Sequence, residues 1–184
     1  MKSTKVNKFI ALAGQVAAKD FITGTPEQRK LGAQLLLSEV LEYVVHGLGV
    51  EPELNGVRIS SPDALHYHNV GEPDKLEMLD GLADVAYTMY WNSETFGVPL
   101  ESAYDLVCDN NLEKFVKLGS WALGSTALEP GEWDCKLGVT WPAEVAAVEV
   151  VQFQGEPYAV GKDSRGKVRK PSTYKSVDLS ELCR

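Results

Sequence analysis

Residues 35–46 read LLLSEVLEYVVH, and this stretch decides the fold that the sequence predicts. On a helix, with about 100° between neighbouring residues, its leucines, valines and tyrosine occupy nearly the whole circumference. Glu39, Glu42 and His46 fall together in one narrow stripe. Because a helix that is apolar on most sides is usually buried, we expect the two carboxylates to lie in a crowded place and to meet a cation there.

A second row of acidic side chains lies on another predicted helix, over residues 73–96. Glu77, Asp80 and Asp84 stand at positions i, i+3 and i+7, which places them on one face of that helix. Clustered carboxylate oxygens are suitable ligands for Mg²⁺ or Mn²⁺. Two other interpretations stay open: this row is a solvated face, or the glutamates of the first stripe form ion pairs with Lys or Arg.

The chain changes character near residue 118, where helical spacing gives way to the pattern of strands. Apolar spacing predicts four helices, over residues 4–18, 26–46, 73–96 and 100–117. The valine-rich stretch 146–153, a turn, and residues 158–160 predict a β-hairpin. The expected fold is therefore mainly α, a helical bundle with a small β-hairpin elaboration near the C-terminus.

Composition excludes some partners. The chain has 18 Lys and Arg against 26 Asp and Glu, a net charge of −8, so we expect no nucleic-acid binding, which needs a basic patch. Apolar runs are short, so we expect no membrane span and no signal peptide. Cys108, Cys135 and Cys183 form no C-x-x-C pair, which predicts reduced thiols. The expected location is the cytoplasm, or the host cytoplasm for a viral protein.

The acidic helices resemble the all-α nucleoside triphosphate pyrophosphohydrolase superfamily, the MazG-like enzymes. The matching residues come in the family's order: Arg29, Glu39-x-x-Glu42, the stretch Leu79–Tyr87 with Glu77 ahead of it, Asn111-x-x-Lys114, and a tail Gly166–Pro171 with Tyr174 that is similar to the Gly-Lys-Val-x-Lys-Pro tail of phage-type members. The resemblance covers about residues 5–117 and 161–179. It implies a single MazG-like domain over residues 1–184.

The sequence also departs from the family pattern. Ser38 stands where the first motif often has a leading Glu, and this removes one possible ligand. The segment between the two acidic motifs is longer than is common in the family, so residues 50–72 are interpreted as an insertion. Residues 118–160 are interpreted as an elaboration that contains the hairpin, and residues 161–184 as a basic tail.

The resemblance implies hydrolysis of a nucleoside triphosphate to the monophosphate and pyrophosphate, with two or more Mg²⁺ ions (or Mn²⁺) per site. The implied ligands are Glu39, Glu42, Glu77 and Asp80, with Asp84 as a further ligand or as a group behind them. The second motif pairs either Glu77 with Asp80 or Asp80 with Asp84. The catalytic base that takes a proton from water would be Glu39 or Glu42.

Phosphate oxygens would be met by four residues, Asn111, Lys114, Lys167 and Lys170. Tyr87 and Trp91 would line the base or sugar pocket, or else pack against a neighbouring helix or subunit. By analogy with the family, we expect a homodimer or homotetramer.

Substrate choice stays open at this level. One hypothesis is a (d)NTP pyrophosphohydrolase directed at purines such as dGTP or GTP, with a role in a viral nucleotide pool. The alternatives are a dUTP/dCTP-type or phosphoribosyl-ATP-type pyrophosphohydrolase, or a catalytically silent nucleotide-binding module. Groups in the inserted segments, such as Asn55, His66 and His68, are candidates for base recognition.

Overall fold

Residues 3–183 are described by the computed structural model, and the chain divides into two compact units. The smaller one, Phe21–Asp74, we name the hairpin unit; the larger one, which combines the chain up to Asp20 with everything from Lys75 onward, we name the sheet unit. Among the described residues, no helix combines the length and the apolar character needed to cross a membrane.

The hairpin unit begins with the helix that carries the first acidic pair, α2 (Pro26–Glu42). Thr25 is its N-cap: the backbone N–H of Gln28 donates to the Thr25 hydroxyl at 3.2 Å, and the Gln28 side chain accepts from the Thr25 N–H at 2.8 Å. This capping box, with Pro26 at the first helical position, confirms the predicted start of the helix. After Glu42 the chain continues as a π-helical turn, η1 (Tyr43–Gly47).

The rest of the hairpin unit contains one short strand pair, which lies within residues 50–72. Strands β1 (Glu53–Leu54) and β2 (Val57–Arg58) pair antiparallel, and a 3-10 turn, η2 (Pro62–Ala64), follows. Asn55 and Gly56 connect the strands with φ of 51° and 80°, the left-handed geometry of a two-residue hairpin turn. The backbone thus gives Asn55 a turn-forming role.

Three helices of the sheet unit are α1 (Ser3–Leu12), α3 (Lys75–Phe96) and α4 (Leu100–Leu112). A tight turn at Gly97 joins α3 to α4, and the Ser93 hydroxyl donates to the Val98 carbonyl at 2.7 Å across it. Both α1 and α4 are shorter than predicted. The first ends before Gly14, which has φ of 70°, and the other ends because the chain enters a strand at Val116.

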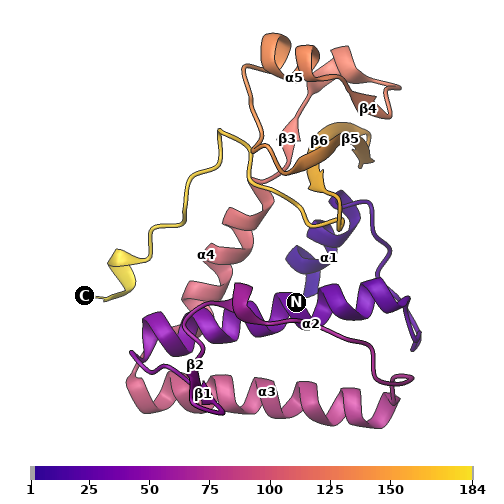
Figure 1. Ribbon diagram of the computed structural model, residues 1–184. Helices are drawn as coiled ribbons and strands as arrows, with labels where there is room; N and C mark the ends of the chain where they lie inside the picture. The colour runs from indigo at the N-terminus through magenta and orange to yellow at the C-terminus, as the bar shows by residue number, and fades with distance from the viewer. Residues whose placement is uncertain (1–2, 184) are drawn as a thin grey trace. The chain divides into compact units, whose positions relative to one another are not determined.

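An antiparallel sheet completes this unit, in the order β3-β6-β5-β4 (Figure 1). The central hairpin consists of β5 (Val145–Phe153) and β6 (Glu156–Asp163). The edge strands β3 (Val116–Lys117) and β4 (Ala127–Leu128) have two residues each, and the short helix α5 (Pro130–Leu137) follows β4. Two 3-10 turns, η3 (Gly119–Ala122) and η4 (Ser180–Cys183), complete the unit.

The prediction of a mainly α bundle with a small hairpin is wrong. The structure is about 47% helical and 14% strand, with two sheets, and is a mixed α/β fold. The hairpin of β5 and β6 was predicted, but β3 and β4 extend it on both edges into a four-stranded sheet. A strand of two residues cannot show the alternation by which strands are recognised in a sequence, so the sheet was underestimated.

Consecutive residues of β6 are buried in different clusters, which explains why the sheet is integral to its unit. Ala159 belongs to a cluster with Leu118, Val148 and others, against which the tryptophans of α5 and the following loop pack. Val160 belongs to a second cluster with Leu12, Ala13 and Phe115. Because neighbouring side chains of a strand point to opposite faces, β6 is covered on both sides. The second cluster ties the chain just after α4 to the strand that leads into the basic tail.

Candidate functional site

The first acidic pair lies on the last turn of α2. Glu39 and Glu42 are separated by one helical turn, as predicted, and both side chains are exposed. The expectation that this helix is buried is wrong: none of its residues is buried, and Leu35, Leu36, Leu37 and Val40 are each about two fifths exposed. The apolar side chains of its second half are thus partly exposed and are not enclosed in a core.

The turn that follows the pair changes the predicted stripe. From Tyr43 the backbone is π-helical, with more residues per turn than an α-helix. The α-helical spacing that put His46 in line with the two glutamates therefore ends at Glu42. Ser38, which stands in place of a family Glu, turns its hydroxyl back to the Leu35 carbonyl at 3.0 Å, a common local bond of serine inside helices.

The second acidic row lies on α3. Glu77, Asp80 and Asp84 are all exposed. Gly81 interrupts the row in the middle of the helix, and a Cβ placed there would meet no atom within 4 Å. Glycine inside a helix lowers the stability of the helix by about 0.5–1 kcal/mol relative to alanine. The open space beside Asp80 is therefore accompanied by a less stable helix.

Large apolar side chains surround this acidic row. Ten of them on α3 are exposed: Leu76, Met78, Leu79, Leu82, Val85, Tyr87, Met89, Tyr90, Trp91 and Phe96. Tyr87 is 69% exposed and Trp91 53%. Exposed apolar surface of this extent is typical of a binding surface.

The two acidic rows belong to different compact units. Within residues 3–183, no three His, Cys, Asp or Glu side chains converge as a ready-made metal site. The carboxylates are nevertheless the oxygen donors that Mg²⁺ prefers, and their exposure leaves them accessible to a hydrated ion.

Three of the four predicted phosphate-binding residues come together in the sheet unit. Lys114 lies just after α4 and donates to Asn111 Oδ1 at 2.5 Å. Its Nζ lies 5.9 Å from the centre of the Tyr174 ring, and the Nζ of Lys170 lies 4.8 Å from the same ring. The fold therefore brings the ammonium groups of Lys114 and Lys170 to one aromatic side chain of the tail, and Asn111 contacts this group through Lys114.

The fourth predicted residue, Lys167, lies in a tight turn built on Asp163. The Asp163 carboxylate accepts from the backbone N–H groups of Arg165 and Lys167, both at 2.9 Å, and pairs with Arg169 Nη2 at 2.9 Å. Burial opposes ionisation of Asp163, but these donors outweigh it and lower its pKa. The backbone of Lys167 is fixed, while Arg169 is occupied by the internal ion pair.

Two residues that sequence reasoning did not assign a role are central to this arrangement, Asn110 and Asp163. Asn110 is 7% exposed; its Oδ1 accepts the Tyr174 hydroxyl and its Nδ2 donates to the Lys175 carbonyl at 2.7 Å. A polar residue between Asp109 and Asn111 gives no signal of burial, because all three residues are hydrophilic. For Asp163, the Gly166-Lys167 turn that begins three residues later was a signal in the sequence.

Arg29, the residue ahead of the first motif, serves its own unit. Its Nη1 donates to the Thr23 and Gly24 carbonyls at 3.4 and 3.2 Å and lies 3.7 Å from a Glu72 carboxylate oxygen. These contacts hold the chain that enters α2.

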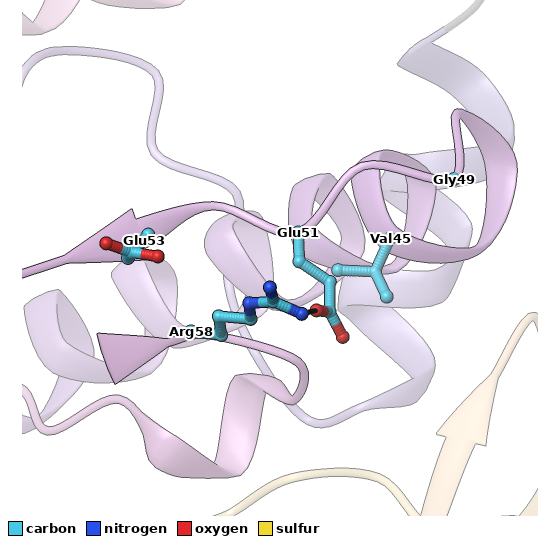
Figure 2. Close-up of a pocket in the computed structure, with 5 residues that line it drawn as sticks. All are labelled: Val45, Gly49, Glu51, Glu53 and Arg58. Atoms are coloured by element: carbon cyan, nitrogen blue, oxygen red, sulfur yellow. Dashed lines mark ion pairs between the residues drawn. The ribbon is translucent and has the colours of Figure 1, made fainter. Parts of the chain in front are cut away.

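An open hollow of about 550 Å³ lies in the hairpin unit, next to the strand pair. Figure 2 shows the guanidinium of Arg58 directed at Glu51, with Glu53, Val45 and Gly49 around them. The Arg58 Nη1 to Glu51 Oε2 distance is 3.5 Å. None of the predicted site residues lines this hollow.

Comparison of the chain with protein-family models, with curated proteins and with solved structures finds no match.

Proposed function

We propose that this protein is a metal-dependent nucleoside triphosphate pyrophosphohydrolase, which converts a (d)NTP and water to a (d)NMP and pyrophosphate. The observation that carries the proposal is the pair of exposed acidic rows, Glu39 with Glu42 on α2 and Glu77 with Asp80 and Asp84 on α3. Both rows interrupt helices that are otherwise rich in apolar side chains.

The donor set fits Mg²⁺ or Mn²⁺. Hard divalent cations take carboxylate oxygens and keep several waters, and exposed carboxylates at i and i+3 can share such an ion. We assign Glu39, Glu42, Glu77 and Asp80 as ligands, with Asp84 as a further one. When bound, the metal would neutralise phosphate charge and acidify water.

In the reaction, a water oxygen attacks the α-phosphorus and its proton passes to Glu39 or Glu42. The bond between the α-phosphorus and the oxygen that bridges to the β-phosphate breaks. The pyrophosphate leaves with the bridging oxygen. A general base of this kind contributes about 10²–10⁴-fold to the rate.

The basic residues of the sheet unit would receive the phosphate chain. Lys114 and Lys170 supply positive charge, Asn111 orients Lys114, and the fixed turn presents Lys167. Tyr87 and Trp91 offer exposed aromatic faces for a base or sugar, and base stacking is worth about 1–3 kcal/mol where it occurs.

The exposed apolar surface of α3 supports a further part of the proposal, that a second copy of the chain covers it. Isolated soluble chains rarely leave so many large apolar side chains in water. A homodimer, or a homotetramer built from it, would bury those of them that do not contact the base or sugar. We place the protein in the cytoplasm, where triphosphates are available.

The direct test exchanges one carboxylate for an amide of the same shape. Glu42→Gln removes the charge of the proposed base or ligand and is expected to lower turnover by at least about 100-fold. Glu94→Gln is the matched control, because Glu94 is exposed on α3 about 15 Å beyond Asp84 along the helix. Near-wild-type turnover of the Glu42→Gln variant, with Mg²⁺ saturating, would refute the assignment.

One observation favours a second function, that of a catalytically silent nucleotide-binding module. Ser38 offers a hydroxyl bonded to its own helix rather than a carboxylate. A silent nucleotide-binding module would bind triphosphates with Mg²⁺ and release no product.

A further inference from the structure

The β1–β2 hairpin places a carboxylate beside a guanidinium. Glu53 and Arg58 are register partners across the two strands. The next backbone hydrogen bond, from the Ile59 N–H to the Pro52 carbonyl, measures 2.8 Å. Because hydrogen-bonded and non-hydrogen-bonded pairs alternate along an antiparallel ladder, Glu53 and Arg58 form a non-hydrogen-bonded pair. Side chains lie closer together in such a pair than in its hydrogen-bonded neighbours, so these two project side by side from one face.

Opposite charges in this position normally stabilise a strand pair by contacting each other, but here the two charged groups are turned apart. The Arg58 Nη1 atom lies 3.5 Å from Glu51 Oε2, and Figure 2 shows the Glu53 carboxylate apart from this pair. Within residues 3–183, no hydrogen bond or ion pair involves the Glu53 side chain. The hairpin therefore presents a free carboxylate next to a guanidinium that is contacted through Nη1 alone.

The open hollow that these groups line has the size of a small-molecule site. Its volume is about 550 Å³, and such sites commonly measure about 300–1,000 Å³. Val45 contributes apolar surface, and Gly49, with φ of 68°, leaves one flank open because a Cβ there would meet no atom within 4 Å. Val45 follows Glu42 by three residues in the same compact unit. The hollow therefore begins close to the first acidic pair.

The chemistry of the two side chains selects among planar ligands. A carboxylate accepts hydrogen bonds and a guanidinium donates them, so the matching ligand has adjacent donors next to adjacent acceptors. Guanine has this pattern: its N1–H and 2-amino groups are neighbouring donors, and its O6 and N7 atoms are neighbouring acceptors that arginine binds bidentately. Adenine and cytosine have a single amino donor on the corresponding edge, and uracil and thymine have a single N–H. Guanine is therefore the base that uses both side chains fully.

We propose that the hollow of the hairpin unit is a binding site for a guanine base. The Glu53 carboxylate accepts from the N1–H and 2-amino groups, and the Arg58 guanidinium donates to O6 and N7. That the guanine belongs to a nucleotide rests on the proposed function; the placement of a free carboxylate beside a guanidinium does not. For the proposed hydrolase, the site makes guanine nucleotides the preferred substrates.

The test compares binding of GMP, AMP, IMP and 7-deaza-GMP by calorimetry in EDTA. All of them carry the same ribose and phosphate, so differences among them report contacts with the base. Wild-type protein is expected to bind GMP at least about tenfold more tightly than AMP. IMP lacks the 2-amino group and 7-deaza-GMP lacks the N7 acceptor. Each is expected to bind roughly tenfold more weakly than GMP, as loss of one hydrogen bond to a charged group does.

Two variants connect each side chain to one edge of the base. Glu53→Gln should weaken GMP binding roughly tenfold and remove the difference between GMP and IMP. Its lost negative charge would by itself favour an anion, so weaker GMP binding reports the lost base contact. Arg58→Gln should remove the difference between GMP and 7-deaza-GMP but keep that between GMP and IMP. The controls Glu94→Gln and Lys30→Gln remove equal charges at exposed positions outside the hollow and should bind like the wild type.

Other outcomes would overturn the guanine site. Equal binding of GMP and AMP by the wild type would do so, as would a Glu53→Gln variant that still distinguishes GMP from IMP. An Arg58→Gln variant that weakens all the nucleotides equally would show the loss of a charge and not of a base contact. Triphosphate hydrolysis without guanine selectivity would refute this site and leave the proposed function standing. GMP selectivity that depends on Glu53, in a protein that hydrolyses no triphosphate, would support the site and refute the proposed function.

Discussion

The Tyr174 hydroxyl donates a hydrogen bond to Asn110 Oδ1, which lies 64 residues earlier in the chain, and the same Asn110 side chain binds the Lys175 carbonyl. This buried amide joins the end of α4 to the basic tail. The residues proposed to hold phosphate lie on either side of it, Asn111 and Lys114 on the helix end and Lys170 on the tail.

Replacing Asn110 should detach the tail. Asn110→Ala leaves the Tyr174 hydroxyl and the Lys175 carbonyl without their partner, and we expect a loss of about 1–3 kcal/mol in the free energy of unfolding. Urea denaturation measures this, with Asn7→Ala as the control because Asn7 is exposed on α1. Equal stability of the two variants would show that the amide contributes nothing.

Stability should depend on pH through Asp163. Its folded-state pKa is lowered from an unfolded-state value of about 3.9, so its contribution is complete above that value and is lost as the pH falls through the folded-state pKa. The Asp163→Asn variant lacks this term and should show a flatter profile of unfolding free energy below about pH 5. Hydrogen exchange at the Arg165 and Lys167 amides should become faster in the variant; parallel profiles with unchanged exchange would contradict the assignment.

Gly161 should tolerate no side chain. A Cβ there would collide with the indole ring of Trp141, which packs against the first core cluster. Gly161→Ala is expected to destabilise the sheet unit by about 1–3 kcal/mol. Gly131→Ala on α5 is the control, because a Cβ there meets no atom within 4 Å. Thermal unfolding of both variants checks the difference, and equal midpoints would be inconsistent with the close packing of Trp141.

Replacement of Gly81 by alanine should have the opposite effect on stability from replacement of Gly161. Gly81→Ala adds a methyl group in open space on α3 and should stabilise the helix by about 0.5–1 kcal/mol. If the space beside Asp80 admits a hydrated metal or a phosphate, turnover should fall while stability rises. A variant that is both more stable and fully active would show that the space is not used.

A charge in the apolar surface of α3 should dissociate the oligomer. Leu82 is exposed in the single chain, and Leu82→Glu would place a carboxylate in the interface that a second copy forms. Light scattering should give a dimer or tetramer for the wild type and a monomer for the variant. Ser120→Glu, an exposed position on η3, is the charge control. A wild-type monomer would contradict the proposed second copy.

The sequence predicted those elements whose signals are local. The approximate spans of α2 and α3 and the β5–β6 hairpin each have a recognisable pattern over four residues or more. The π-helical turn at Tyr43–Gly47 and the two-residue strands β3 and β4 have no such pattern. The two strands depend on pairing partners further along the chain, which explains why the mixed α/β fold was missed.

For the candidate site too, the sequence predicted the features that depend on local spacing and missed those that depend on distant contacts. Helical spacing correctly placed Glu39 with Glu42, and Glu77 with Asp80 and Asp84, on single helices. The expected burial of α2 was wrong. An apolar pattern indicates that a helix surface is suited to burial, but it does not indicate what covers that surface. Asn110 and Asp163 were missed since a polar residue becomes a buried anchor only through contacts that the fold creates.

The most direct measurement is chromatography of the products formed from each common NTP and dNTP with Mg²⁺ or Mn²⁺, for the wild type beside the Glu42→Gln variant. The proposed function predicts a monophosphate and pyrophosphate in equal amounts from the wild type, with one base preferred, and at least about 100-fold less product from the variant. Release of a diphosphate and inorganic phosphate, or no turnover of any triphosphate with either metal, would contradict it.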